Sequence, residues 1–126
     1  YVQYAFARIN SLFRTLNINL ENKVKLNEEN FKLNSIEEKI IRKIFEWPKI
    51  VESASKKFEI HKIPFYLYDL STLFHSYWSK GNDDKKYKFI ANDKIKRVEI
   101  LVIINLVIIV IQNGMKILGV SLPKKM

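Results

Sequence analysis

The stretch ILVIINLVIIVI at residues 100–111 is apolar except for Asn105, and the polar residues Glu99 and Gln112 bound it. It falls short of the about 20 residues that a transmembrane helix needs. We therefore interpret it as a buried core element. Because such an element is apolar on every side, other parts of the fold must surround it.

The residues around this stretch favour a helix over a buried strand, although its many β-branched side chains would suit either. Asn92 or Asp93 is a candidate N-cap, and Gly114 is a candidate left-handed C-cap. The span between these caps is long for a strand and ordinary for a helix. We expect the helix to end at Gly114 and the tail over residues 118–126 to leave the bundle.

Residues 1–16 form the first of four further segments with the three-and-four spacing of an amphipathic helix. Its apolar stripe consists of Val2, Phe6, Ile9, Phe13 and Leu16. Residues 17–34 follow, rich in Asn, Lys and Glu without a sustained period. We expect them to form a long exposed polar loop.

The next three helical segments have recognisable boundaries. A capping box of Ser35 and Glu38 begins one helix, and Pro48 separates it from another that runs to about Glu59. Pro64 begins the last of them, and residues 81–84 stop it. The stripe of this last segment is Leu67, Leu70, Phe74 and Tyr77. Together the segments predict an all-α fold, an antiparallel bundle of about five helices.

The composition fits one core-forming domain without catalytic machinery. The chain has 126 residues, of which 48% are hydrophobic and 28% charged, and its three glycines and three prolines are too few for a turn-rich all-β fold. Cysteine is absent and histidine occurs twice, which excludes disulfides, thiolate metal sites and a histidine-rich metal site. No glycine-rich phosphate loop or nucleophile motif is present. We expect neither catalytic residues nor a bound metal.

The charge balance predicts attraction to a polyanion. Lysine and arginine total 22 residues against 13 acidic ones, a formal net charge of +9, which suits nucleic acid or an anionic membrane. The cations are nearly all lysine and are spread along the chain, as AT-rich coding alone would produce. Charge therefore leaves the kind of partner open.

A second stripe on the first helical segment is the first functional signal. Tyr1, Tyr4 and Arg8 share a line roughly 130° from the apolar stripe at 100° per residue. A core-facing helix does not need two tyrosines and an arginine on its other side. Such a stripe suits stacking on unpaired bases, and it would equally suit packing against a domain upstream of Tyr1.

Aromatic residues are concentrated in the segment that begins at Pro64. They are Tyr66, Tyr68, Phe74, Tyr77 and Trp78. An aromatic stripe at helical spacing is typical of a core, and we interpret these residues in that way. His75 is interpreted as a packing residue whose ring nitrogens have partners.

Four segments together resemble the C-terminal anticodon-binding domain of arginyl-tRNA synthetases. YVQYAFAR at residues 1–8 is similar to the family's YVQYAHAR, and FYLYDLSTLFHSYW at 65–78 to its YL-x-x-LA-x-x-F-x-x-FY block. NGMKILGVSLPKKM at 113–126 is similar to NGL-x-LLG-x-x-x-P-E-R-M, and residues 36–54 resemble the family's second and third helices. The similar segments follow the family's order over nearly the whole chain.

The chain departs from the family pattern at a few positions. Phe6 stands where a histidine is common, so any polar contact made by that histidine is lost. Lys124 and Lys125 replace Glu-Arg, which makes the tail more positive, and Ser71 and Ser79 replace Ala and Asn.

The resemblance implies that residues 1–126 are an anticodon-binding domain, part of a longer enzyme whose upstream catalytic domain is absent. That enzyme ligates arginine to its tRNA with ATP and magnesium, whereas this part would be non-catalytic and hold no cofactor. The implied partners are an arginine tRNA and the enzyme's own catalytic domain. We expect a cytoplasmic monomer that binds no membrane.

The resemblance also implies a site. Tyr1, Tyr4, Arg8 and Met126 would line the pocket for the anticodon loop. Lys124 and Lys125 would make weaker contacts to phosphates. Recognition of loop bases by stacking and edge contacts, with lysines on the phosphates, agrees with these residue types.

Two other functions are compatible with the composition. One is a stand-alone helical protein-interaction module with a basic surface, whose tyrosine stripe docks a partner. The other is a peripheral membrane module that uses the lysines.

Overall fold

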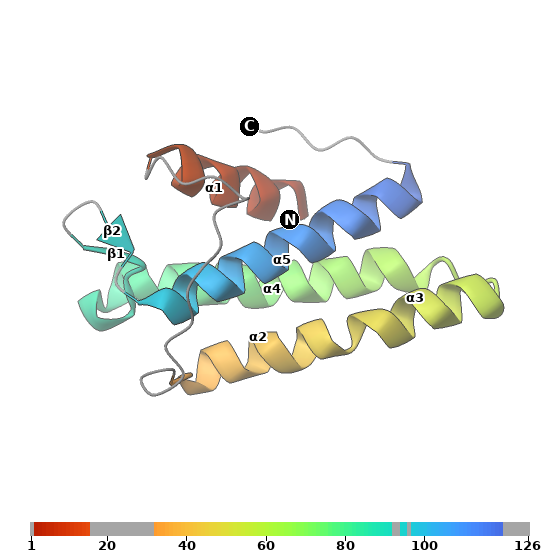
Figure 1. The fold of residues 1–126 in the computed structure, drawn as a ribbon, viewed down its shortest axis with the longest axis horizontal. Coiled ribbons are helices and arrows are strands. Elements are labelled where there is room, and N and C mark those ends of the chain that lie inside the picture. The colour runs from red at the N-terminus through yellow and green to blue at the C-terminus, as the bar shows by residue number, and fades with distance from the viewer. Residues whose placement is uncertain (1, 16–31, 92–93, 96, 120–126) are drawn as a thin grey trace.

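The computed structural model describes residues 2–15, 32–91, 94–95 and 97–119 (Figure 1). The helices are α1 (Val2–Thr15), α2 (Ser35–Phe45), α3 (Trp47–Lys56), α4 (Lys62–Asp83) and α5 (Val98–Leu118). A 3₁₀ turn, η2 (Lys85–Tyr87), and a two-stranded antiparallel ladder, β1 (Ile90–Ala91) with β2 (Lys94–Ile95), lie between α4 and α5. The predicted all-α class is confirmed. In the described part of the chain the α-helices number five, or four if α2 and α3, which form one bent rod, are counted once.

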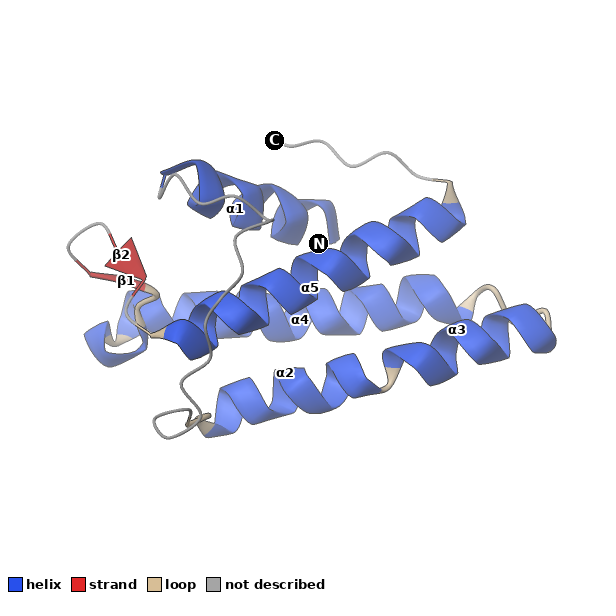
Figure 2. Ribbon diagram, in the orientation of Figure 1, coloured by secondary structure: helices blue, strands red, loops and turns tan. Residues whose placement is uncertain are grey.

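The helices pack around an antiparallel pair, α4 and α5. The rod of α2 and α3 lies along one side of this pair, and α1 lies on the other side (Figure 1). Both α1 and α2 contact α4 and α5. The short ladder sits beside the end of α4, and Ile90 of β1 packs against the core (Figure 2). The predicted polar loop lies largely outside the described residues.

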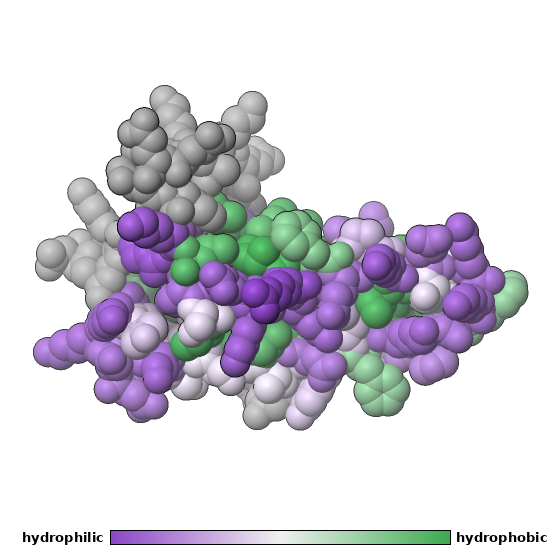
Figure 3. All heavy atoms as spheres, turned by 90° about the horizontal axis from the view of Figure 1, so that it is seen from below, coloured by the Kyte–Doolittle hydropathy of each residue, from purple (hydrophilic) through white to green (hydrophobic). Residues whose placement is uncertain are grey.

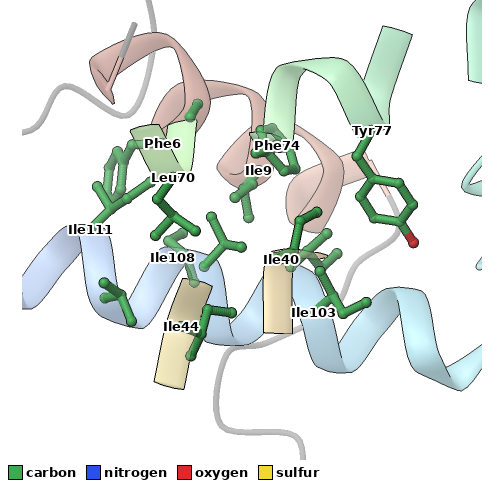
Figure 4. Packing of buried hydrophobic residues seen from close by; sticks show 14 of the residues in the cluster. Phe6, Ile9, Ile40, Ile44, Leu70, Phe74, Tyr77, Ile103, Ile108 and Ile111 are labelled. Carbon is green, nitrogen blue, oxygen red and sulfur yellow. The ribbon is translucent and has the colours of Figure 1, made fainter. Parts of the chain in front are cut away.

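The core is centred on α5, as the apolar stretch predicts. Its buried residues are Glu99, Ile100, Ile103, Ile104, Val107, Ile108, Val110, Ile111, Gly114 and Met115. In the close view of the core, labelled side chains of α1, α2 and α4 lie around those of α5 (Figure 4). They are Phe6, Ile9, Ile40, Ile44, Leu70 and Phe74. Burying an isoleucine side chain contributes about 1.5–3 kcal/mol, so this packing supplies most of the drive to fold.

By length and composition α5 would suffice to cross a membrane, the one such helix in the described part of the chain. Its most apolar window is 56% buried inside the bundle. Most of the apolar residues of α5 thus pack inside the bundle, although Ile109 and Ile117 are 47% and 45% exposed, and we assign α5 as the core helix.

The predicted ends of α5 are wrong. The helix begins at Val98, with Arg97 at its N-cap, because the preceding residues pair as β1 and β2 with Ile90 opposite Ile95. It continues past Gly114 and ends at Gly119, whose φ of 72° is left-handed. A Cβ on Gly114 would lie 2.7 Å from a methyl carbon of Leu67. Gly114 therefore allows α4 and α5 to approach closely and does not end the helix.

The other helix boundaries shift by a few residues. The capping box is made by Asn34, whose side chain accepts from the Glu37 N–H at 2.9 Å while the Glu37 carboxylate accepts from the Asn34 N–H at 3.0 Å. The predicted box of Ser35 and Glu38 is thus displaced by one residue. Pro48 does lie in the first turn of α3, where its missing N–H costs nothing.

The carboxylate of Glu37, fully buried, joins four parts of the chain. Its Oε2 accepts from the Tyr77 hydroxyl at 2.5 Å, and its Oε1 accepts from Arg97 Nη2 at 2.9 Å. Arg97 Nη2 also donates to the Lys32 carbonyl at 2.7 Å and to Glu99 Oε2 at 3.1 Å. A buried carboxylate without such partners would be strongly destabilising. We call Glu37, Tyr77, Arg97 and Glu99 the Glu37 network.

The Glu37 network predicts acid-sensitive stability. Burial raises the pKa of Glu99, but hydrogen bonds from its own backbone N–H, the Lys32 N–H and Arg97 outweigh burial and hold the pKa below its ordinary value of 4.5. A lowered pKa adds stability above the ordinary value, and this stability is lost as the pH falls through the lowered one. Urea unfolding from pH 7 to pH 3 should therefore show wild type losing its advantage over Glu99→Gln as the pH drops. The exposed Glu38→Gln is the control, and a wild-type advantage that does not change with pH would contradict the assignment.

Candidate nucleic-acid interface

The two stripes predicted on the first helix lie on different sides of α1. Ala5, Phe6, Ile9, Leu12 and Phe13 are buried in the core. Tyr4 is 57% exposed and Arg8 is half-buried. The core contacts of α1 thus leave the Tyr4 ring at the surface. The other predicted site residues lie outside the described part of the chain; they are Tyr1, Lys124, Lys125 and Met126.

Arg8 reaches from α1 to α4 and is held there by two side chains. Its Nη1 lies 3.1 Å from Nδ1 of His75. Its Cζ lies 5.1 Å from the centre of the Trp78 ring, a cation–π contact. His75 and Trp78 are three residues apart and share one face of α4. We call Tyr4, Arg8, His75 and Trp78 the α1–α4 face.

Phe89 supports Trp78 from the core side. The rings of Trp78 and Phe89 meet edge to face, with centres 5.3 Å apart and planes at 83°. Phe89 is itself buried and packs against Tyr77 at 4.5 Å between centres. A cavity of about 240 Å³ opens beside them, lined by Trp78, Gly81, Asn82, Lys88, Phe89 and Ile90. An anchored indole next to an amide and an ammonium suits an unpaired base and its phosphate.

Lysines gather where α4 ends. Lys80 and Lys86 lie on the Tyr87 ring, with Nζ 5.3 and 5.8 Å from its centre, and Lys85 and Lys88 are exposed nearby in the chain. Hydrophilic side chains are prominent at this end of the molecule in Figure 3. These lysines could contact phosphates without reading sequence. Sequence reasoning assigned phosphate contacts to Lys124 and Lys125 and missed this group.

The aromatic residues of α4 divide between core and surface. Tyr66, Phe74 and Tyr77 are buried, as predicted. Tyr68 is 51% exposed, which contradicts its predicted place in the core. Trp78 is half-buried beneath Arg8, and His75 has Arg8 as a partner, in agreement with a histidine whose ring nitrogen is satisfied. Sequence reasoning did not connect either residue with Arg8, although their spacing on α4 places them on one face.

Comparisons with known proteins cover the whole chain. The family model described as "DALR anticodon binding domain" matches residues 2–126. An arginine–tRNA ligase from Pelagibacter ubique is 46% identical over 126 residues, and one from Bartonella bacilliformis is 37% identical over 132. Each match covers 100% of this chain, which spans 22% and 23% of the two relatives.

A solved structure, described as an arginyl-tRNA synthetase from Campylobacter jejuni, shares the fold. It superposes with a TM-score of 0.78 at 20% identity, over 100% of this chain and 26% of the solved one. At that identity the likeness supports the helical architecture alone. The family model covers every residue after the first, and the relatives match this chain over its full length. The chain therefore belongs to the DALR anticodon binding domain family.

Proposed function

We propose that this chain binds the anticodon stem-loop of an arginine tRNA through the α1–α4 face. The observation that carries the proposal is the Arg8 guanidinium stacked on Trp78, one helical turn from the exposed Tyr4 ring. Unpaired bases stack on aromatic rings and guanidinium planes, whereas a duplex hides its base faces. An arginine tRNA is proposed because the relatives that match the whole chain are named arginine–tRNA ligases.

Further residues complete the proposed site. Tyr1 and Met126 add an aromatic ring and an adaptable thioether to the pocket, and Lys124 and Lys125 contact phosphates. The resemblance of the two chain ends to the family's motifs supports these four assignments. The exposed lysines at residues 85–88 extend the phosphate contacts.

The catalytic reaction belongs to the longer protein. We propose that the longer protein of which these residues form a domain ligates arginine to its tRNA with ATP and magnesium, and that this domain docks the tRNA for a separate catalytic domain. Within the described ranges no three His, Asp or Glu side chains gather to hold a metal. ATP and magnesium are assigned to the catalytic domain because the resemblance implies them there, and the protein is proposed to be a cytoplasmic monomer. Similarity to arginine–tRNA ligases over the full length of this chain favours this function over a stand-alone interaction module or a membrane module.

Binding to tRNA should be selective and strongly dependent on salt. Fluorescence anisotropy should give a higher affinity for a tRNA with an arginine anticodon than for other tRNAs. The affinity should fall steeply between 50 and 200 mM salt, because lysine–phosphate contacts release counterions. Equal affinity for all tRNAs and for duplex DNA would reduce the site to a generic basic surface.

Replacing Tyr4 by alanine should separate binding from folding. We expect tRNA affinity to fall by about 1–3 kcal/mol, since a stacked base loses its ring. The melting temperature should change little, because the ring is exposed. Phe13→Ala should instead cost about 3–5 kcal/mol of unfolding free energy through a core cavity. Phe58→Ala, at an aromatic residue that is 92% exposed between α3 and α4, is the binding control. If Tyr4→Ala unfolds the domain, the stripe is structural.

The tail offers a test of the residues taken from the resemblance. Lys124→Ala/Lys125→Ala should reduce the salt dependence of tRNA binding, because two phosphate contacts are lost. Met126→Ala should lower affinity at every salt concentration and leave the salt slope unchanged. If Met126→Ala binds like wild type, the assignment of the methionine to the pocket is wrong.

A further inference from the structure

The Arg8 guanidinium of α1 forms a hydrogen bond with His75 of α4. The two residues are 67 positions apart, so the contact exists only because α1 crosses α4. Arginine is a long side chain that loses considerable rotamer freedom when it is fixed. A hydrogen bond at one edge and an indole under one face determine both the position and the plane of this guanidinium.

The chemistry of the contact fixes the state of the imidazole. A guanidinium has five N–H donors and no acceptor. Nδ1 of His75 therefore accepts with its lone pair, and the ring is neutral with its proton on Nε2. Nη1 donates one N–H to His75, and the guanidinium has further N–H donors that can bind other partners.

His75 lies on a part of α4 that is anchored in the core. Phe74, directly before it, and Tyr77, two residues after it, are both buried, with exposed fractions of 0% and 1%. The Phe74 and His75 rings lie 5.8 Å apart between centres. His75 is half-buried, so it links the buried residues of α4 to the half-buried Arg8. Its hydrogen bond therefore holds Arg8 in a fixed place relative to the core.

We propose that His75 is a positioning residue for RNA binding, which acts by presenting Arg8 over Trp78 in the orientation that meets the anticodon loop. The inference rests on the proposed function and adds to it a residue that touches Arg8 instead of the RNA. Fixing Arg8 before binding removes an ordering cost that the complex would otherwise bear. A hydrogen bond that involves a charged group is strong enough for its loss to lower affinity by about tenfold.

Variants of His75 and Arg8 test the proposal by anisotropy with an arginine-tRNA anticodon stem-loop. His75→Leu should bind about tenfold more weakly. His75→Asn should bind close to wild type, because its amide oxygen can accept where Nδ1 did. In an Arg8→Ala background, His75→Leu should cause no further loss, since the two residues act as one unit. Thermal unfolding of each variant confirms that it is folded.

The tautomer of His75 gives a second readout that needs no binding. In wild type, ¹⁵N chemical shifts should show neutral His75 protonated on Nε2, with Nδ1 unprotonated and free to accept from Arg8. A ring protonated on Nδ1 in wild type would overturn the proposal, as would a His75→Leu variant that binds like wild type. An equal loss from His75→Leu with and without Arg8 would also overturn it, because His75 would then act independently of Arg8. Failure of wild type to bind the stem-loop would instead refute the proposed function, with the tautomer still reporting on the contact.

Discussion

The fold depends on covering α5, a helix of 21 residues that has no continuous polar face. Its apolar side chains need partners on several sides, and α1, α2 and α4 supply them. This demand also determines the functional surface. Because α1 must turn Phe6, Ile9 and Phe13 toward the core, Tyr4 is left facing outward and Arg8 is placed against α4.

The Glu37 network gives this apolar packing a defined register. Apolar contacts are non-directional, so isoleucines alone would allow neighbouring helices to slide. A buried carboxylate that needs Tyr77 of α4 and Arg97 at the start of α5 fixes where those helices begin and end relative to α2. Burial raises the pKa of Tyr77, and its bond to Glu37 raises it further, so the hydroxyl stays a donor. The same network fixes α4, which carries His75 and Trp78.

Local patterns in the sequence were sufficient to predict which segments form helices, but not the residues at which several of these helices begin and end. The stripe of α4 and three members of the α1 stripe, Phe6, Ile9 and Phe13, are buried as their spacing predicts, since periodicity reflects which side faces a core. Val2 is half-buried, and Leu16 lies outside the described residues. The sequence alone does not tell which of the two glycines, Gly114 or Gly119, ends α5. In the fold, Gly114 lies against Leu67 of α4 inside the helix, and Gly119 adopts the left-handed conformation that ends it. Asn34 likewise forms the cap because Glu37 is drawn into a network with residues about 40 and 60 positions away.

The candidate site follows the same division. The outward position of Tyr4 could be predicted from the helical period, whereas the contacts of Arg8 with His75 and Trp78 depend on how two distant helices cross. Tyr1 and Met126 stay predictions.

The central claim is that the α1–α4 face receives the anticodon loop, and the two tryptophans of the chain allow a direct measurement. Trp78 lies under Arg8, whereas Trp47 packs on Tyr66 at 5.2 Å near the other end of α4. In a ¹⁵N-edited titration with an arginine-tRNA anticodon stem-loop, the account predicts that the Trp78 indole signal shifts saturably and the Trp47 signal stays in place. Saturable binding that moves Trp47 and leaves Trp78 unchanged would contradict it.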